Sequence, residues 1–377
     1  MRRIVIVGGS IAAVTAAGAL RAQGWDGELT VISKEHEDPY SRVPLSKGIL
    51  AGTSDPQSAA LSKLPDDVVL IRGASATGLD VSNRTVSLSD GRTIVFDGTV
   101  IATGSHARRL AQRGQRGEFV LRTLADARDI CTRLLNVRSA IVVGSGFLAM
   151  EVASTLISRG VRVSLIAQTL PQQRQLGEWL AGLVTRRAAA RGLEVIVSPN
   201  SATLVGDPVH GVSVNGRGVM NADLVVTAVG DIPAVEWLAT SRLPVQNGLV
   251  VDERCRTAAA WVTAAGDVTV RRSTDGTYAR LPHWTNAIAQ AKTAACSLLD
   301  ADSAAYEDQH YFWTEQFGVD LKIAGTIPRS GEPRVLAGDP HSGPALLQWA
   351  DHDRPVAAAA LNYRIPVAKL RKLATEG

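Results

Sequence analysis

The feature that most constrains this chain is a glycine-rich turn that occurs twice. Residues 8–13 (Gly-Gly-Ser-Ile-Ala-Ala) follow the apolar run 4–7, and residues 144–149 (Gly-Ser-Gly-Phe-Leu-Ala) follow the apolar run 140–143. Each is a buried-strand pattern, then a tight turn, then a helix pattern. Small residues let the backbone approach a pyrophosphate, which the positive N-terminus of the helix attracts. Two such units predict two dinucleotide sites, and hydride transfer from a nicotinamide to a flavin is the chemistry that pairs two dinucleotides.

The composition places the chain among folded proteins without a membrane span. It has 377 residues, of which 45% are hydrophobic and 20% charged. No apolar stretch approaches the roughly 20 residues that a membrane helix needs. The apolar run 4–7 is too short for the apolar region of a signal peptide, which takes about 7–15 residues. We therefore expect a cytoplasmic protein that does not bind a membrane.

Cysteine spacing and charge exclude further classes. Cys131, Cys255 and Cys296 are far apart, so the sequence predicts neither structural disulfides nor a bound metal. The net charge is +4, with arginine clusters at 108–116 and 271–272. These clusters are either solvated loops or a docking face for an acidic partner. No recognition motif indicates a nucleic-acid partner.

Periodicity predicts an α/β protein with short strands and few long helices. The stretch 105–117, rich in Arg and Gly, reads as a linker. We expect helices over residues 11–23, 121–135, 285–299 and 367–374, and strands near 28–33, 68–72, 85–88, 93–96, 100–102, 195–197, 211–214, 224–229, 248–251, 261–264, 321–324, 335–336 and 345–349.

Several motifs, taken in order, resemble one family. They are Pro39-Tyr40-Ser41-Arg42-Val43-Pro44-Leu45-Ser46-Lys47, Ile101-Ala102-Thr103-Gly104, Leu121-Arg122-Thr123-Leu124, the second glycine turn through Glu151, Ala264-Ala265-Gly266-Asp267, His283-Trp284 with Asn286-Ala287, and Tyr311-Phe312-Trp313 with Gln316. Over the whole chain this order resembles the flavoprotein ferredoxin and rubredoxin reductases of the glutathione-reductase superfamily.

The resemblance implies a doubly wound architecture. It consists of two Rossmann-like dinucleotide-binding domains and a small C-terminal α+β domain. The FAD domain is split by the inserted NAD(P)H domain. The implied boundaries are 1–113 and 238–302 for FAD, 114–237 for NAD(P)H, and 303–377 for the domain that covers the flavin.

The resemblance also assigns residues to a non-covalent FAD. Glu35 would accept the adenosine ribose hydroxyls, unless it is a solvated loop acid. Asp267 would bind the ribitol chain, unless it is only a helix N-cap. Trp284 opens the helix whose backbone meets the pyrimidine edge. The remaining implied contacts are Gly8, Ser10 and Ala12 at the pyrophosphate, with Arg42, Lys47, Ala76, Thr103, Gly104 and Arg122 elsewhere.

Lys47 and Glu151 are the residues to which the resemblance gives a catalytic role. A lysine near flavin N5 stabilises negative charge on the reduced ring, and Glu151 would hold its ammonium in place. The disulfide-reducing relatives have cysteines just ahead of this lysine. No cysteine lies there in this chain, so we do not expect disulfide reduction, peroxidase or CoA-disulfide chemistry.

The nicotinamide site departs from the family in three places, of which the first is Ala149, where the family has the third glycine of the turn. Its implied contacts are Gly144, Gly146, Phe147, Leu148, Glu151 and Gly230. The strand after the second turn ends in Ala167-Gln168, where an NADH enzyme usually has an acid. Without that acid a 2′-phosphate is not repelled, and Arg174 is close enough in sequence to bind it. Both NADH and NADPH therefore stay open. Pro282 also replaces a glutamate that flanks the nicotinamide in the family.

These observations lead to one main hypothesis and two alternatives. The main one is an FAD-dependent NAD(P)H:ferredoxin or rubredoxin oxidoreductase, a monomer or homodimer. Its partner would be a small acidic iron–sulfur protein that feeds an oxygenase. The first alternative is a flavoenzyme that acts directly on a small molecule. The second is a flavin-bearing redox sensor or scaffold with little turnover.

Overall fold

Each glycine-rich turn follows the central strand of a five-stranded parallel sheet. In the computed structural model, which describes residues 1–199, 202–272, 276–307 and 310–376, these central strands are β1 (Arg3–Val7) and β10 (Ser139–Val143). The chain divides into two units. One contains Met1–Ser41, Ala59–His106 and Ile232–Gln309, and the other contains Arg42–Ser58, Ala107–Asp231 and His310–Gly377. The α/β fold class predicted from the sequence is confirmed.

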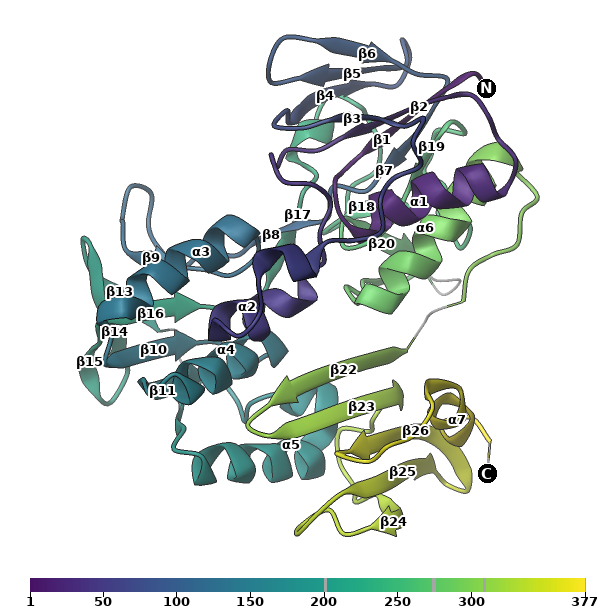
Figure 1. Cartoon of the computed structure of the whole chain (residues 1–377). Coiled ribbons are helices and arrows are strands. Elements are labelled where there is room, and N and C mark those ends of the chain that lie inside the picture. Colours follow the sequence, from purple (N-terminus) through teal and green to yellow (C-terminus); the bar gives the residue numbers. More distant parts are fainter. Residues whose placement is uncertain (200–201, 273–275, 308–309, 377) are drawn as a thin grey trace. The chain divides into compact units, whose positions relative to one another are not determined.

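The parallel sheet of the first unit is covered on both faces. Its order is β19-β7-β1-β2-β3. Ile4 and Ile6 point to one face, where they pack with α1 and α6, which lie side by side in Figure 1. Val5 and Val7 point to the other face, against the antiparallel sheet β4-β5-β6. A strand buried on both faces must be apolar throughout, which explains the unbroken run 4–7.

The elements of the first unit have the following bounds: β1, α1 (Ile11–Ala22), β2 (Glu28–Ile32), β3 (Val69–Ile71), β4 (Ala76–Asp80), β5 (Thr85–Leu88), β6 (Thr93–Val95), β7 (Gly98–Ile101), η4 (Glu236–Leu238), β18 (Leu249–Val251), β19 (Val262–Ala264), β20 (Thr269–Arg272), β21 (Tyr278–Ala279) and α6 (Trp284–Leu299). Strands β18, β20 and β21 form a further small sheet.

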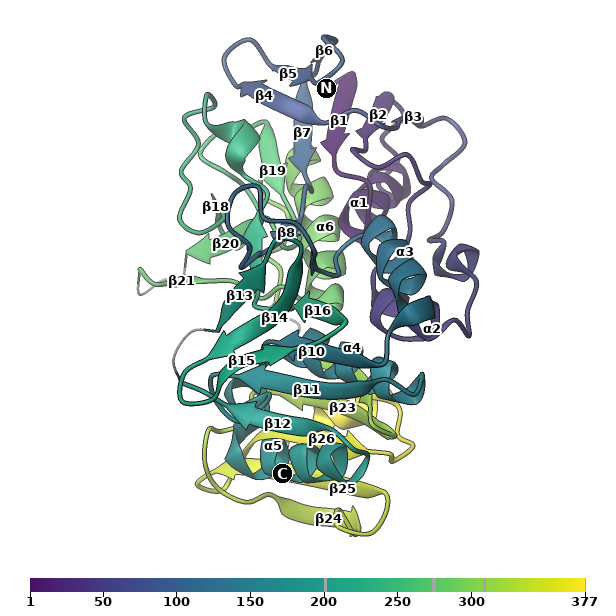
Figure 2. The same cartoon turned by 90° about the vertical axis from the view of Figure 1, so that its left-hand side faces the viewer.

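The second unit repeats this plan and adds a C-terminal sheet. Its parallel sheet has the order β12-β11-β10-β16-β9, most of which can be followed in Figure 2. One face packs on the antiparallel sheet β13-β14-β15, and α4 packs on β10 and β11. The C-terminal sheet, β22-β23-β26-β25-β24, is antiparallel and packs against α7. This is the small α+β domain that the sequence predicts, although strands β22 and β26 were not expected from the pattern.

The elements of the second unit are η1 (Val43–Ser46), α2 (Gly48–Ala51), β9 (Glu118–Phe119), α3 (Leu124–Arg133), η3 (Leu134–Asn136), β10, α4 (Phe147–Ser158), β11 (Arg162–Ala167), α5 (Gln173–Ala190), β12 (Glu194–Val197), β13 (Thr203–Gly206), β14 (Val209–Val214), β15 (Gly218–Asn221), β16 (Leu224–Thr227), β22 (Tyr311–Gln316), β23 (Val319–Gly325), β24 (Arg334–Gly338), β25 (Ala345–Asp351), β26 (Arg354–Leu361) and α7 (Val367–Leu373). The short 3-10 turn η2 (Pro56–Ala59) and strands β8 (Ser105–Ala107) and β17 (Asp231–Pro233) lie where the chain passes from one unit to the other, and β8 falls in the stretch predicted as a linker.

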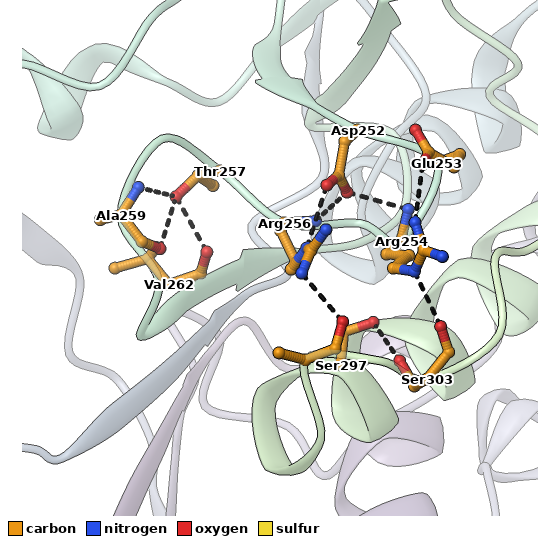
Figure 3. Close-up of polar contacts among 10 residues, drawn as sticks. Asp252, Glu253, Arg254, Arg256, Thr257, Ala259, Val262, Ser297 and Ser303 are labelled. Carbon is orange, nitrogen blue, oxygen red and sulfur yellow. Dashed lines mark hydrogen bonds and ion pairs between the residues drawn. The ribbon is translucent and has the colours of Figure 1, made fainter.

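A polar network ties the loop before β19 to the end of α6. The Asp252 carboxylate accepts the backbone N–H groups of Arg254 and Arg256 and binds the Arg256 guanidinium at 3.0 Å (Figure 3). The guanidinium of Arg256 donates to the Ala301 carbonyl, and that of Arg254 to the Ser303 carbonyl. These bonds anchor the strand that leads into Gly266-Asp267.

Candidate functional site: two dinucleotide cradles and a buried ion pair

Gly8 makes a close backbone contact that no other residue type can make. Its N–H donates to the Ile32 carbonyl at 2.8 Å, and its φ is +139°. A Cβ at this position would lie 2.1 Å from the Ala102 carbonyl oxygen. The turn can therefore pack closely against the edge of the sheet. We call the backbone of this turn and the N-terminus of α1 the first cradle.

The N-terminus of α1 is open to an anion. Ser10 is the N-cap residue in extended conformation, yet its side chain makes no cap hydrogen bond and donates instead to the Tyr40 carbonyl at 3.4 Å. No acidic residue lies in the first turn, which contains Ala12. Uncapped N–H groups together with the helix dipole suit a pyrophosphate.

Further site residues of the first unit lie beyond the carboxyl ends of parallel strands. Glu35 follows β2, Thr103 and Gly104 follow β7, and Asp267 follows β19. Because the strands are parallel, these residues share one edge of the sheet with Gly8. The Glu35 carboxylate accepts the Tyr40 hydroxyl, and Thr103 Oγ1 donates to the Ala234 carbonyl at 2.9 Å. The Asp267 carbonyl accepts Arg280 Nη2 at 2.7 Å.

The first turn of α6 presents a buried acceptor. Trp284 opens the helix, as the sequence predicts, and the His283 side chain makes no cap hydrogen bond. Asn286 is 1% exposed, and its Nδ2 donates to the Leu281 carbonyl at 2.9 Å. Its Oδ1 accepts no hydrogen bond from any residue that the structure describes. A buried acceptor of this kind is suited to a donor supplied by a bound molecule.

The second glycine turn reproduces the first. Gly144 donates to the Ile166 carbonyl at 2.9 Å and has a φ of +145°, and a Cβ there would lie 2.3 Å from the Ala228 carbonyl oxygen. Gly146 is the N-cap of α4, so this helix also begins without a capping side chain or an acid in its first turn. Phe147 and Leu148 occupy that first turn, with Leu148 exposed.

Gly230 follows the neighbouring strand β16. Its φ is +106°, and its carbonyl accepts the Arg108 N–H at 3.0 Å. It therefore lies at the same sheet edge as the second cradle, since β10 and β16 are parallel. The backbone there has the freedom that only glycine supplies without strain.

Lys47 and Glu151 meet in the second unit, as expected from the sequence. Lys47 Nζ lies 2.8 Å from Glu151 Oε2. Only 18% of the lysine side chain and 9% of the glutamate side chain are exposed. Lys47 lies at the junction of η1 and α2, while Glu151 is in the second turn of α4. The ion pair thus lies at the second turn of α4, the helix whose N-terminus forms the second cradle.

Arg42, Arg122 and Ala76 are in different surroundings. Arg42 Nη1 donates to the Arg122 carbonyl at 2.6 Å, so these two predicted contacts lie together in the second unit. Ala76 is in β4, in the antiparallel sheet of the first unit, and packs against the apolar cluster around Leu79.

Sequence reasoning missed two hydroxyl groups that bind Glu151. Ser46 Oγ donates to Oε2 at 2.5 Å, and Thr314 Oγ1 donates to Oε1 at 2.7 Å. Ser46 precedes Lys47 in a motif that the sequence analysis used, but nothing in the pattern indicates where its hydroxyl points. Thr314 is separated from Glu151 by 163 residues, and no local signal connects the two.

Strand β22 places its aromatic side chains on opposite faces. Phe312 contacts Phe147 of α4, with ring centroids 5.0 Å apart. Trp313 lies 6.1 Å from the Tyr311 ring and packs with the cluster between the C-terminal sheet and α7. Within this unit Trp313 is therefore part of the core of the C-terminal domain.

The cysteines that the structure describes are not paired with one another. None of the three cysteines is in a disulfide, and Cys255 is fully buried. Burial raises the pKa of the Cys131 thiol, against the opposing effect of nearby Arg159. Over the described ranges, no group of three or more His, Cys, Asp or Glu side chains could hold a metal ion. No helix in the described part of the chain is both long and apolar enough to cross a membrane.

Two arginines of the cluster at 108–116 form ion pairs with acidic residues of the second unit. Arg116 lies 3.2 Å from Asp207, and Arg109 lies 3.6 Å from the buried carboxylate of Glu118. Both of these ion pairs lie within the second unit. In the other cluster, Arg271 stacks over Tyr306 at 5.5 Å.

Comparison with known proteins agrees with this geometry. Residues 2–291 match the family described as pyridine nucleotide-disulphide oxidoreductase, and residues 311–377 match the domain described as reductase C-terminal. The first match covers more than half of the chain. The chain therefore belongs to the pyridine nucleotide-disulphide oxidoreductase family and is an oxidoreductase that uses a flavin and a nicotinamide nucleotide.

The relatives to which this chain is similar include several named reductases. The ferredoxin–NAD(+) reductase component of an anthranilate 1,2-dioxygenase system from Burkholderia cepacia is 33% identical, over 99% of this chain and 94% of the relative. Rhodocoxin reductase from Rhodococcus erythropolis is 32% identical, over 90% of this chain and 82% of its own. Among solved structures, the covalent putidaredoxin reductase–putidaredoxin complex superposes with a TM-score of 0.87 at 26% identity, covering 99% of this chain and 93% of that one.

Proposed function

We propose that this protein is an FAD-dependent NAD(P)H:ferredoxin or rubredoxin reductase. The observation that carries the proposal is the pair of matching cradles at Gly8 and Gly144, together with the buried Lys47–Glu151 ion pair at the second turn of α4. The names of the relatives support the same function, since one is the ferredoxin–NAD(+) reductase component of a dioxygenase system and another is a rhodocoxin reductase.

The residues of the first unit are suited to hold FAD. The Gly8 turn and the uncapped α1 would bind the pyrophosphate, and Glu35 and Asp267 at the same sheet edge would bind the ribose and the ribitol chain. The buried Asn286 Oδ1 is available to a donor on the bound group. A bound flavin supplies the chemistry that side chains lack, because it accepts a hydride and gives up electrons singly. Lys47 would stabilise the negative charge that accumulates, and Glu151 would hold the ammonium in place.

The end of β11 supports use of NADPH as well as NADH. Ala167 closes the strand and is buried, and the exposed residues that follow are Gln168 and Thr169. No carboxylate occurs in residues 167–177, so nothing in this segment repels a 2′-phosphate. Arg174, exposed in the first turn of α5, supplies a cation. We expect the ratio of kcat/KM for NADPH and NADH to fall at least tenfold in Arg174→Glu, whereas Arg186→Glu, further along the same helix, leaves the ratio unchanged.

The electron acceptor we propose is a small acidic iron–sulfur protein. Residues 42–47 contain no cysteine, so the thiol that the disulfide-reducing relatives have just ahead of this lysine is missing from the segment. We also propose a location in the reducing cytoplasm, with which three cysteines outside any disulfide agree.

Anaerobic stopped-flow mixing of the purified yellow protein with NADH and, separately, NADPH tests the first half-reaction. Steady-state turnover with an added ferredoxin tests the second. Rapid flavin reduction followed by turnover with ferredoxin is the expected result. Turnover with a small-molecule acceptor but with no ferredoxin or rubredoxin would contradict the proposed partner. A colourless protein that takes up no FAD would contradict the proposal as a whole.

A further inference from the structure

The Glu151 carboxylate is held by three donors. Lys47 Nζ and Ser46 Oγ both reach Oε2, at 2.8 and 2.5 Å, and Thr314 Oγ1 reaches Oε1 at 2.7 Å. Glu151 is 7% exposed, Ser46 is 3% exposed and Thr314 is fully buried. Water therefore cannot replace either hydroxyl without a rearrangement of the surrounding core.

Both hydroxyls must donate to the carboxylate. An ionised carboxylate only accepts hydrogen bonds, so each contact fixes the direction of one O–H group. Hydrogen bonds to a charged group are about twice as strong as neutral ones. The two hydroxyls hold both oxygens of Glu151, and the lysine ammonium then has a single position in which it meets its counter-ion.

The hydroxyls come from segments that are rigid for independent reasons. The Ser46 carbonyl accepts Thr155 Oγ1 at 2.7 Å, which ties η1 to α4 one turn after Glu151. Thr314 is in β22, where it pairs with Leu321 of β23. Phe312, two residues earlier on the same face, packs on Phe147 of α4. The C-terminal sheet thus reaches the carboxylate directly.

We propose that Thr314 and Ser46 are positioning residues for the Lys47–Glu151 pair. They orient the Glu151 carboxylate, so that the lysine ammonium holds its place when charge builds up beside it. This inference rests on the proposed function for the role of Lys47, whereas the hydrogen-bond network itself does not depend on that role. It gives the C-terminal domain a part in flavin reduction, through Thr314.

The variant Thr314→Val removes the hydroxyl and keeps the shape of the side chain. In anaerobic stopped-flow experiments with the holoprotein, we expect the limiting rate of flavin reduction to fall about tenfold, as for loss of one hydrogen bond to a charged group. We expect the Kd for NAD(P)H to change less than about twofold. Thr314→Ser, which restores the hydroxyl, should recover most of the rate. Ser46→Ala should resemble Thr314→Val.

A control variant separates positioning from general destabilisation. Thr99 is as fully buried as Thr314, but its hydroxyl donates to the Val5 carbonyl in the core of the first unit. Thr99→Val should leave the reduction rate unchanged. The flavin midpoint potential should shift in Thr314→Val in the same direction as in Glu151→Gln, and it should stay at the parental value in Thr99→Val.

Two results would overturn the inference. One is that Thr314→Val keeps the parental rate of flavin reduction and the parental flavin midpoint potential while Lys47→Met is reduced slowly. The proposed function would then stand, but Thr314 would have no positioning role. The other is an equal loss of rate in Thr99→Val. If the parent protein is not reduced by NAD(P)H at all, the proposed function fails. In that case a double-mutant cycle of Thr314→Val and Glu151→Gln, measured on the free energy of unfolding, tests whether the Thr314 hydroxyl and the Glu151 carboxylate interact. A coupling energy of zero would contradict the hydrogen-bond network.

Discussion

Replacement of Lys47 by Met removes the cation and keeps most of the side-chain volume. Loss of one partner from a buried ion pair costs about 3–5 kcal/mol, because the other charge stays behind unpaired. Here the Glu151 carboxylate keeps the Ser46 and Thr314 hydroxyls. We therefore expect a smaller loss of unfolding free energy, about 2–3 kcal/mol. At about 2.1 cal/mol/K of unfolding entropy per residue, that corresponds to a fall in Tm of roughly 2–4 °C for a chain of 377 residues.

The same substitution should have a larger effect on the rate of flavin reduction. Loss of one preorganised group at a site of developing charge typically lowers a rate by about 10²–10³-fold. Anaerobic stopped-flow measurement of flavin bleaching by NAD(P)H gives this rate directly, and differential scanning calorimetry gives Tm.

A matched control lies in the same unit. Lys322 pairs with Asp320 at 2.9 Å, but 30% and 45% of these side chains are exposed. Exposed pairs contribute about 0–1 kcal/mol, so Lys322→Met should leave both rate and Tm near the parental values. A parental reduction rate in Lys47→Met would refute the assignment of Lys47 to the flavin. If Tm falls no more in Lys47→Met than in Lys322→Met, the estimated cost of leaving the buried Glu151 carboxylate without its lysine is wrong.

Three further predictions concern other parts of the molecule. Gly8→Ala should yield protein that purifies without flavin, whereas Gly144→Ala should retain flavin and lose nucleotide affinity at least tenfold; absorbance spectra and nucleotide titration distinguish the two, and a yellow Gly8→Ala protein contradicts the first cradle. Electron transfer to an acidic ferredoxin should slow with added salt, more than flavin reduction does, and the double change of Arg271 and Arg272 to Glu should slow it further; salt-independent turnover in both proteins would make these arginines ordinary surface residues. Because burial raises the pKa of Cys131, less thiolate is present at neutral pH, so iodoacetamide should label this thiol slowly at pH 7 and faster as the pH rises toward and above 9; fast labelling at pH 7, located by peptide mass spectrometry, would contradict this.

Local patterns in the sequence were sufficient for the elements that carry the cradles. The runs 4–7 and 140–143 are apolar throughout because each strand is buried on two faces, and a glycine must follow each strand because a neighbouring carbonyl occupies the space of a Cβ. The helix that begins at Trp284 was equally evident. These features depend on residues within a few positions of one another. The motif resemblance extended the prediction to the fold class and to the meeting of Lys47 with Glu151.

Tertiary structure alone decided what surrounds that ion pair. The hydroxyl donors of Glu151 come from positions 105 and 163 residues away, on a 3-10 turn and a strand of the C-terminal sheet. Strand β22 was not expected, and the alternation that points Thr314 toward α4 and Trp313 toward α7 follows from its pairing with β23. A serine or threonine has no sequence pattern that shows what its hydroxyl binds. Only the packing of distant segments determines whether such a group lies on the surface or fixes a buried carboxylate.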